Sequence, residues 1–334
     1  MSVGAATTTR RRGRLGIALA AVIVTVTAGC SLAGYPQTPL PTATPSAAPT
    51  TGGGATSAPA TCENAVASYA PAGTQPSAGD MPSGSTMRKI QDRGRLIAGV
   101  SADTYLLGSR NPLNGKIEGF DIDMVKAIAK AIFGDENRYE LKVITAAQRI
   151  PALQDGTVDI VARNMTINCD RWKQIGFSTE YYRAGQKILV QRGSKAKTLA
   201  DLSGQKVCAP NGTSSMDNLK KLNPKAIPVG SDSHTGCLVL FQSGAVAAIT
   251  GDDTVLAGLA AQDPYAVVPD QKAFTAEPYG VGVNAKNVDL TRFVNQVLAG
   301  MRSDGEWTAI YNRWLRDVLG PAPAPPKAVY GRAP

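Results

Sequence analysis

The sequence predicts an α/β fold built from two series of strand–helix units. Three observations support this prediction. Short apolar runs of strand length alternate with helical apolar patterns from Arg88 onward, as in βαβ units. An extended segment around Ile188 separates the two series. The chain has 334 residues, more than one hydrophobic core usually organises, so we expect two lobes, although periodicity alone leaves one large sheet open.

The first series of elements lies between Arg95 and Ala162. Its strands are short runs rich in Leu, Ile and Val, and its longer helix repeats apolar residues at helical spacing. In chain order we expect a strand at 95–100, a helix at 123–133, a strand at 141–144, a short helix at 150–153 and a strand at 158–162. This alternation favours a parallel-rich sheet.

The second series follows the extended segment and repeats the pattern. We expect a strand at 205–209, helices at 213–222 and 237–243, strands at 247–250 and 279–283, and an amphipathic helix carrying Phe293, Val294, Val297, Leu298 and Met301. Thr213 and Ser214 are candidate caps of the first of these helices.

The N-terminus has the pattern of an export signal, which we place at residues 1–29. An arginine cluster precedes a run of about a dozen small or apolar residues, too short to span a membrane. The sequence Thr27-Ala28-Gly29-Cys30 resembles a bacterial lipobox, in which Cys30 is acylated and anchors the mature chain to the membrane. An ordinary cleaved signal peptide is the alternative.

Two segments have the composition of unfolded chain. Residues 30–86 are rich in Pro, Ser, Thr, Ala and Gly and predict a tether between the lipid and the folded part. Residues 319–334 form a Pro-rich tail that we expect to be stiffer and also unfolded.

Composition and charge argue against a disordered protein, a nucleic-acid-binding protein and a metalloprotein. Hydrophobic residues make up 43% of the chain, which excludes a wholly disordered protein. The net charge is +9, but four arginines belong to the export signal and the other basic residues are scattered, so no nucleic-acid partner is expected. The single histidine, His234, and the wide spacing of the cysteines give no support for a metal site or another cofactor.

Four cysteines besides Cys30 favour two disulfides in an exported chain. Three pairings of Cys62, Cys169, Cys208 and Cys237 are possible, and free buried thiols are the alternative.

Between about residue 90 and residue 318 the chain resembles the polar-amino-acid solute-binding proteins of ABC importers, bacterial solute-binding protein family 3. Among these it is similar to the glutamate/glutamine-type binding lipoproteins of actinobacteria. Six motifs in family order carry the resemblance: GFDID at 119–123, LQDGTVD at 153–159, NMTINCDR at 164–171, FSTEYY at 177–182, LADLSGQKV at 199–207 and DGEW at 304–307.

The resemblance implies a bilobed periplasmic-binding-protein-like α/β fold, with two parallel-rich sheets joined by two crossing strands and the ligand in the cleft between the lobes. Lobe 1 would comprise residues 87–187 and 280–318, and lobe 2 residues 188–279. The crossings would lie near 186–191 and 278–283. In this frame we expect the pairings Cys208–Cys237 within lobe 2 and Cys62–Cys169 at lobe 1.

The resemblance also implies which residues bind the α-carboxylate of an amino acid. Arg171 matches the family arginine, and its planar guanidinium can bond both carboxylate oxygens. Thr166 matches a hydroxyl and main-chain contact, and Asn164 a main-chain contact. Thr213 and Ser214 fall at a helix start, where free N–H groups favour an anion. Surface pairing of Arg171 and simple helix capping are the structural alternatives.

The resemblance also implies which residues contact the α-ammonium and the side chain of the ligand. Asp252 matches the family aspartate that binds the α-ammonium, although the adjacent Asp253 could take its place. Arg149 and Arg163 lie near matched binding segments, where a cation favours an acidic or amidated side chain, and a solvated surface position is the alternative for each. Leu107 stands where many relatives have an aromatic ring, so the pocket departs from that of the glutamine-specific members. We expect glutamate, aspartate or asparagine ahead of glutamine.

The function expected from these residues is extracytoplasmic binding of a polar amino acid by lobe closure, and its delivery to an ABC permease by a lipid-anchored monomer. A sensor that presents the amino acid to a membrane signalling partner would use the same cleft and is the first alternative. A dehydratase-like enzyme is the second, but acid–base chemistry needs a positioned titratable group, and we expect His234 to be an exposed loop residue.

Overall fold

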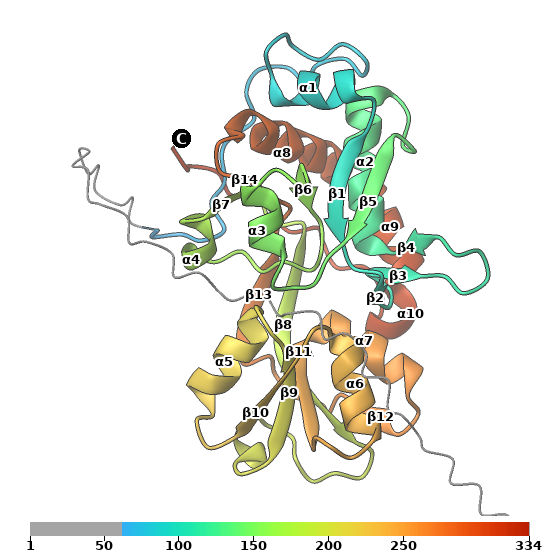
Figure 1. Cartoon of the computed structure of the whole chain (residues 1–334), viewed down its shortest axis with the longest axis vertical. Coiled ribbons are helices and arrows are strands. Elements are labelled where there is room, and N and C mark those ends of the chain that lie inside the picture. The colour runs from blue at the N-terminus through green and yellow to red at the C-terminus, as the bar shows by residue number, and fades with distance from the viewer. Residues whose placement is uncertain (1–61, 334) are drawn as a thin grey trace, which may run out of the picture. The chain divides into compact units, whose positions relative to one another are not determined.

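The structure is a computed structural model that describes residues 62–333. The export signal, Cys30 and residues 30–61 of the expected tether lie outside the described residues. Figure 1 shows two α/β bodies, each with helices packed around its own sheet. One sheet has five strands and the other has six. We call the two bodies lobe 1 and lobe 2. The bilobed α/β fold is confirmed, while both sheets are mixed and not purely parallel.

Lobe 1 is organised around a sheet of order β5-β1-β6-β14-β7. Its strands are β1 (Leu96–Val100), β5 (Tyr139–Val143), β6 (Ile160–Val161), β7 (Ile175–Phe177) and β14 (Gly282–Asn284). Its helices are α1 (Thr86–Arg93), α2 (Phe120–Phe133), α3 (Arg149–Gln154), α4 (Cys169–Trp172), α8 (Val288–Ser303), α9 (Glu306–Trp314) and α10 (Arg316–Leu319). β1 pairs in parallel with β5 and β6, and β14 returns antiparallel to β6 and β7.

Lobe 2 is organised around a sheet of order β10-β9-β11-β8-β12, with β13 also paired to β8. Its strands are β8 (Tyr182–Gln191), β9 (Lys206–Pro210), β10 (Ile227–Ser231), β11 (Ala248–Asp252), β12 (Ala266–Val267) and β13 (Thr275–Tyr279). Its helices are η1 (Ala200–Leu202), α5 (Ser214–Leu222), α6 (His234–Gln242) and α7 (Asp253–Gln262). Lobe 2 contains two separate buried apolar clusters. One includes Val207 and Leu219, and the other includes Phe241 and Leu256.

Two chain segments connect the lobes. β8 enters lobe 2 directly after the lobe 1 residue Tyr181, and β13 leads back to lobe 1 through Gly280. The two strands pair antiparallel from Tyr182–Tyr279 to Gln186–Thr275. A pair of hydrogen-bonded strands therefore joins the two lobes.

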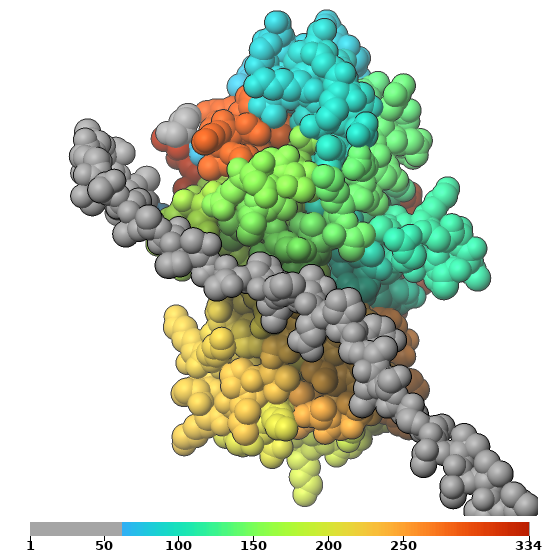
Figure 2. Space-filling view, in the orientation of Figure 1, coloured from blue at the N-terminus to red at the C-terminus, as the bar shows by residue number. Residues whose placement is uncertain are grey.

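A small three-stranded sheet completes lobe 1. It contains β2 (Asp103–Thr104), β3 (Gly108–Arg110) and β4 (Ile117–Glu118). The hairpin between β3 and β4 projects from the surface in Figures 1 and 2, and its Leu113 is 94% exposed. None of this sheet was expected, because its strands are too short to show a period.

The structure differs from the expectation of unfolded chain at residues 62–86 and 319–333. The main chain of Ser68 bonds Val329, and Ser68 itself is fully buried against lobe 1. Arg302 of α8 donates to the carbonyl of Pro326. Backbone and side-chain hydrogen bonds hold these segments, although their composition is that of unfolded chain. Within residues 62–333, no helix is long and apolar enough to cross a membrane.

Candidate functional site

Residues from both lobes enclose a cavity of about 10 Å³ at their junction. The lining residues are Arg149, Asn164 and Thr166 from lobe 1, and Thr213, Ser214, Ser215, His234 and Asp252 from lobe 2. The structure therefore brings together six of the eight expected ligand-binding residues. Arg171 and Arg163 do not line the cavity.

Buried polar atoms without partners are concentrated in this cavity. Asn164 Oδ1, His234 Nε2 and Asp252 Oδ1 have no hydrogen-bond partner, and among the described residues Arg302 Nη1 is the only other such buried side-chain atom. An unpaired buried polar atom costs about 1–3 kcal/mol, so folded proteins rarely keep three of them together. The cavity is thus chemically prepared for a ligand that carries both donors and acceptors.

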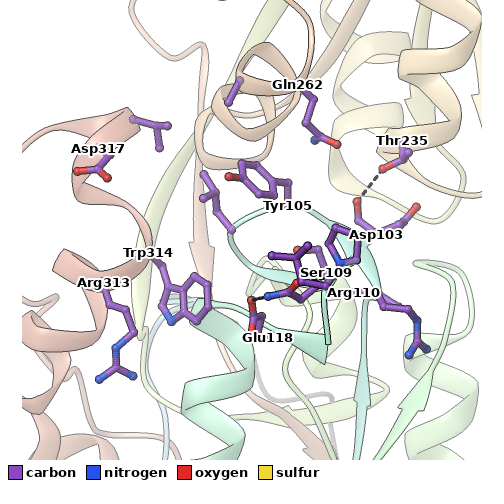
Figure 3. A pocket seen from close by; sticks show the side chains of 17 residues that line it. Asp103, Tyr105, Ser109, Arg110, Glu118, Thr235, Gln262, Arg313, Trp314 and Asp317 are labelled. Carbon is purple, nitrogen blue, oxygen red and sulfur yellow. Dashed lines mark hydrogen bonds between the residues drawn. The ribbon is translucent and has the colours of Figure 1, made fainter. Parts of the chain in front are cut away.

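A larger hollow of about 890 Å³ lies at another junction of the lobes (Figure 3). Two of its lining side chains are paired within the protein: Thr235 Oγ1 donates to the Asp103 carbonyl at 2.7 Å, and the Trp314 indole donates to Asp123 at 2.7 Å. None of the unpartnered buried polar atoms of the described residues belongs to its lining. Size alone would favour this hollow. The unpartnered atoms favour the small cavity as the binding site.

Two buried arginines approach the same carbonyl next to the cavity. Arg149, at the start of α3, donates through Nη2 to the Gly212 carbonyl at 3.0 Å, and Arg171, on α4, does so at 3.4 Å. Arg171 Nη1 also donates to the Thr166 carbonyl at 2.7 Å. Among the described residues neither guanidinium forms an ion pair. Burial lowers the pKa of both arginines, which means that each would gain from a nearby anion.

Asp252 is the buried carboxylate that faces these cations. It ends β11 and is 3% exposed, and its Oδ2 accepts from the Tyr279 hydroxyl at 2.7 Å. Burial first, and then the neighbouring charge of Glu277, raise the pKa of Asp252 to about 8. A bound cation would favour its ionised form, as expected for the partner of an α-ammonium.

Thr166 and Ser214 meet on Glu277, a residue that the sequence analysis missed. Glu277 lies on β13 and is 1% exposed, and its Oε2 accepts from Thr166 Oγ1 at 2.7 Å and from Ser214 Oγ at 2.6 Å. Its Oε1 accepts from Asn218 and Thr275. Glu277 thus links a lobe 1 hydroxyl to lobe 2. A lone glutamate in an extended run carries no sequence signal for such a role.

Thr213 caps α5. Its hydroxyl accepts from the Met216 N–H at 3.2 Å and donates to the Pro210 carbonyl at 2.6 Å. The capping alternative is therefore realised for this side chain, which also lines the cavity.

Asn164 lines the cavity with a strained backbone. Its φ of 37° is in the left-handed region, where a residue other than glycine needs outside support. The Asp121 carboxylate supplies it by accepting from the Asn164 N–H at 2.8 Å and from the Tyr181 hydroxyl at 2.6 Å. Burial raises the pKa of Asp121 to about 6, despite these bonds. Asp121 belongs to the GFDID motif, but its supporting role was not anticipated.

Arg163 is 5% exposed, and its Nε donates to the Ile144 carbonyl at 2.9 Å, away from the cavity lining. Leu107 is buried in the core of lobe 1.

The expectation that His234 is an exposed loop residue is wrong. It is 6% exposed, begins α6 behind the cap Ser233, and lines the cavity. Burial and the charge of Arg163 lower its pKa to about 3, so the imidazole is neutral at neutral pH. A Cβ at position 251 would stand 2.6 Å from His234 Nε2, so a larger residue than Gly251 would displace the imidazole.

Both disulfides are present in the expected pairing. Cys208 on β9 is joined to Cys237 on α6, and both are fully buried. Cys62 is joined to Cys169 at the start of α4, two residues before Arg171.

The chain is similar in sequence to known binding proteins. A sequence profile of the bacterial extracellular solute-binding proteins, family 3, matches residues 96–317. The ABC transporter glutamine-binding protein GlnH of Bacillus subtilis is 38% identical over 233 residues, which cover 70% of this chain and 85% of that protein. The glutamate-binding protein GluB of Corynebacterium efficiens is 30% identical over 254 residues, 72% of this chain and 84% of that protein.

A solved structure extends the similarity to the fold. The solute receptor for L-cysteine of Neisseria gonorrhoeae has a TM-score of 0.68 and 26% sequence identity. The match covers 71% of this chain and 96% of that structure.

Proposed function

Because the chain belongs to the bacterial extracellular solute-binding proteins, family 3, we propose that it binds a polar amino acid between its lobes and delivers it to the permease of an ABC importer. The family and the relatives are solute-binding proteins and not enzymes, so the rejection of a dehydratase-like activity is confirmed. The family's extracellular location also holds for this chain. We further propose that Cys30 carries the lipid that anchors it.

One observation carries the proposal. The junction of the lobes holds a buried carboxylate with an unpartnered oxygen, Asp252. Beside it lie two buried guanidiniums, Arg149 and Arg171, that have no ion-pair partner within residues 62–333. A free amino acid presents an ammonium and a carboxylate a few bonds apart. It would supply the opposite charge to each group, which removes the cost of burying them unpaired.

The proposed roles follow from this complementarity. Arg171 binds the α-carboxylate, helped by the main chain of Asn164 and by Thr166, Thr213 and Ser214. Asp252 binds the α-ammonium.

Hydrogen bonds between the lobes would be exchanged for bonds to the ligand when it binds. Arg149 and Arg171 donate to the Gly212 carbonyl, and Thr166 Oγ1 lies 3.1 Å from Ser214 Oγ. An entering ligand carboxylate would take over the guanidinium donors and leave the lobes held through the ligand.

The side-chain pocket favours glutamate, aspartate or asparagine ahead of glutamine. Arg149 lines the cavity and can pair with a side-chain carboxylate or donate to an amide oxygen. The neutral His234 imidazole adds a further polar contact. A lysine or arginine side chain would face like charge, and an apolar one would leave Arg149 unpaired.

Calorimetric titration of the purified protein against all common amino acids tests this proposal. We expect glutamate, aspartate or asparagine to bind most tightly. Arg149→Met should weaken glutamate and aspartate more than asparagine. Arg163→Met should have the smaller effect, because its guanidinium does not line the cavity. Tighter binding of lysine, arginine or leucine than of glutamate and aspartate would contradict the proposed ligand class.

A further inference from the structure

The two ends of the described chain meet on the helix that carries Arg171. We call residues 62–69 and 326–332 the terminal clasp. Cys62 is joined by its disulfide to Cys169, the first residue of α4. The N-terminal segment passes beside α4 in Figure 1.

Trp172, the last residue of α4, is held by both halves of the clasp. Its indole Nε1 donates to the Ala65 carbonyl at 2.7 Å, and the Tyr69 ring meets it edge-on at 5.9 Å. The Arg332 guanidinium lies 3.7 Å from the centre of the Trp172 ring. This cation–π contact joins the C-terminal segment to α4.

The halves of the clasp bond to each other and to the core of lobe 1. The Ser68 N–H donates to the Val329 carbonyl at 3.0 Å, and Arg332 Nε donates to the Ala67 carbonyl at 3.0 Å. The buried Ser68 hydroxyl donates to the Phe177 carbonyl at 2.7 Å. The clasp is therefore a fixed part of lobe 1.

Arg171 depends on these contacts for its position. The helix α4 has four residues, fewer than a helix needs to be stable by itself, so tertiary contacts must hold it. Arg171 lies on α4 between Cys169 and Trp172, the two residues that the clasp contacts. A guanidinium that must bond both oxygens of a carboxylate tolerates a displacement of only about 0.5 Å.

We propose that the terminal clasp positions Arg171 for the α-carboxylate of the ligand, so that the Cys62–Cys169 disulfide and Arg332 set ligand affinity without touching the ligand. This inference rests on the proposed role of Arg171.

The chain offers matched variants for a test. Cys62→Ser/Cys169→Ser removes the disulfide, and Arg332→Gln removes the cation–π contact but keeps a polar side chain. Arg292→Gln is the control, because the Arg292 guanidinium lies over the Tyr69 ring at 5.6 Å and bonds the Ala70 carbonyl, but does not reach α4.

The experiment titrates each variant with the tightest-binding amino acid and with its α-amide, alone and combined with Arg171→Lys. We expect the disulfide variant to weaken amino-acid binding about tenfold, Arg332→Gln about threefold and Arg292→Gln less than twofold. The preference for the amino acid over its α-amide should fall by the same factors. Each loss should shrink in the Arg171→Lys background, because the clasp acts through Arg171.

The two proposals fail in different ways. Unchanged affinity in Arg171→Ala and Arg171→Lys would overturn the role of Arg171 itself. If those variants weaken binding while the clasp variants retain wild-type affinity, only the inference is overturned. The inference would also be overturned if the affinity losses of the clasp variants were as large in the Arg171→Lys background as in the wild type. It would be overturned as well if the clasp variants weakened the amino acid and its α-amide equally. Should the disulfide variant fail to fold, Arg332→Gln decides by the same criteria.

Discussion

At the scale of single residues, the strongest prediction concerns Arg171. Its guanidinium is buried and, within the described part of the chain, bonds only main-chain carbonyls. Because removing one partner of a buried charge pair costs about 3–5 kcal/mol, Arg171→Ala should nearly abolish amino-acid binding. Titration calorimetry measures the loss. Lys173→Ala, which removes an exposed lysine two residues away, should bind as the wild type does. An Arg171→Ala affinity within about threefold of the wild type, under about 1 kcal/mol, would contradict the assignment.

Asp252 predicts a specific dependence on pH. Burial raises the pKa of Asp252 from 3.8 to about 8, so the folded, ligand-free protein keeps a proton that the unfolded chain releases. The contribution of Asp252 to the stability of the ligand-free protein should therefore fall as the pH rises from about 4 to about 8, opposed below about pH 6.5 by His234, whose pKa is lowered.

Ligand binding should show the opposite trend. The ammonium requires an ionised Asp252, so affinity should rise towards pH 8 with the release of a proton. Calorimetry in buffers of different ionisation enthalpy counts that proton. In Asp252→Asn both slopes should flatten, and an unchanged proton count in that variant would assign the titration to another group.

Sequence motifs identified the charged residues that we propose to bind the ligand, but not the residues that support them. Thr166 and Arg171 lie within one continuous motif, which made their neighbourhood visible. Glu277 and His234 are brought to the site by chain segments far away in the sequence, and their burial follows only from the packing of β13 and α6. A lone histidine or glutamate in a sequence is more often exposed, so no local pattern could identify them.

At the scale of elements, the turn before α5 is a sensitive contact between the lobes. Gly212 has a φ of +71°, and a Cβ there would stand 2.7 Å from the Cα of Ala147 in lobe 1. Gly212→Ala should weaken ligand binding at least tenfold, by about 1.4 kcal/mol or more, because the lobes cannot approach fully.

Gly244→Ala is the matched control for this substitution. Gly244 has a φ of +72° in the same lobe, but a Cβ there would meet nothing within 4 Å. Both variants should lose about 1–2 kcal/mol of stability from the left-handed conformation. Only Gly212→Ala should lose affinity for the ligand. Thermal unfolding measures the stability of both variants, and calorimetric titration measures their affinities. Equal affinities in the two variants would exclude this contact from closure.

The predicted elements were those with a strong apolar period. α2 was expected at 123–133, within a few residues of its observed ends, and α8 was expected from five apolar residues that all lie within it. The run 279–283 was expected as one strand, but Gly280 and Val281 separate β13 from β14 where the chain returns to lobe 1. β10 was missed because most of its residues are exposed, which leaves no apolar signal.

At the scale of the whole molecule, the size of the cavity determines how a ligand can enter. About 10 Å³ is close to the space of a single water molecule, so an amino acid cannot occupy the site while the lobes are in contact. The lobes must therefore separate first, and β8 and β13 are the connections about which they can move. The hydrogen bonds between the lobes, including the one from Thr235 to the Asp103 carbonyl, must break in that step.

This requirement predicts the kinetics of binding. At high amino-acid concentration the observed rate, followed by tryptophan fluorescence in a stopped-flow instrument, should reach a plateau equal to the rate of lobe opening. Thr235→Val removes a hydrogen bond worth about 1 kcal/mol and should raise the plateau up to about fivefold. Thr235→Ser keeps the hydroxyl and should restore the wild-type plateau. A rate that keeps rising in proportion to concentration would show that the free protein is already open in solution. The contacts between the lobes would then form only after the ligand has bound.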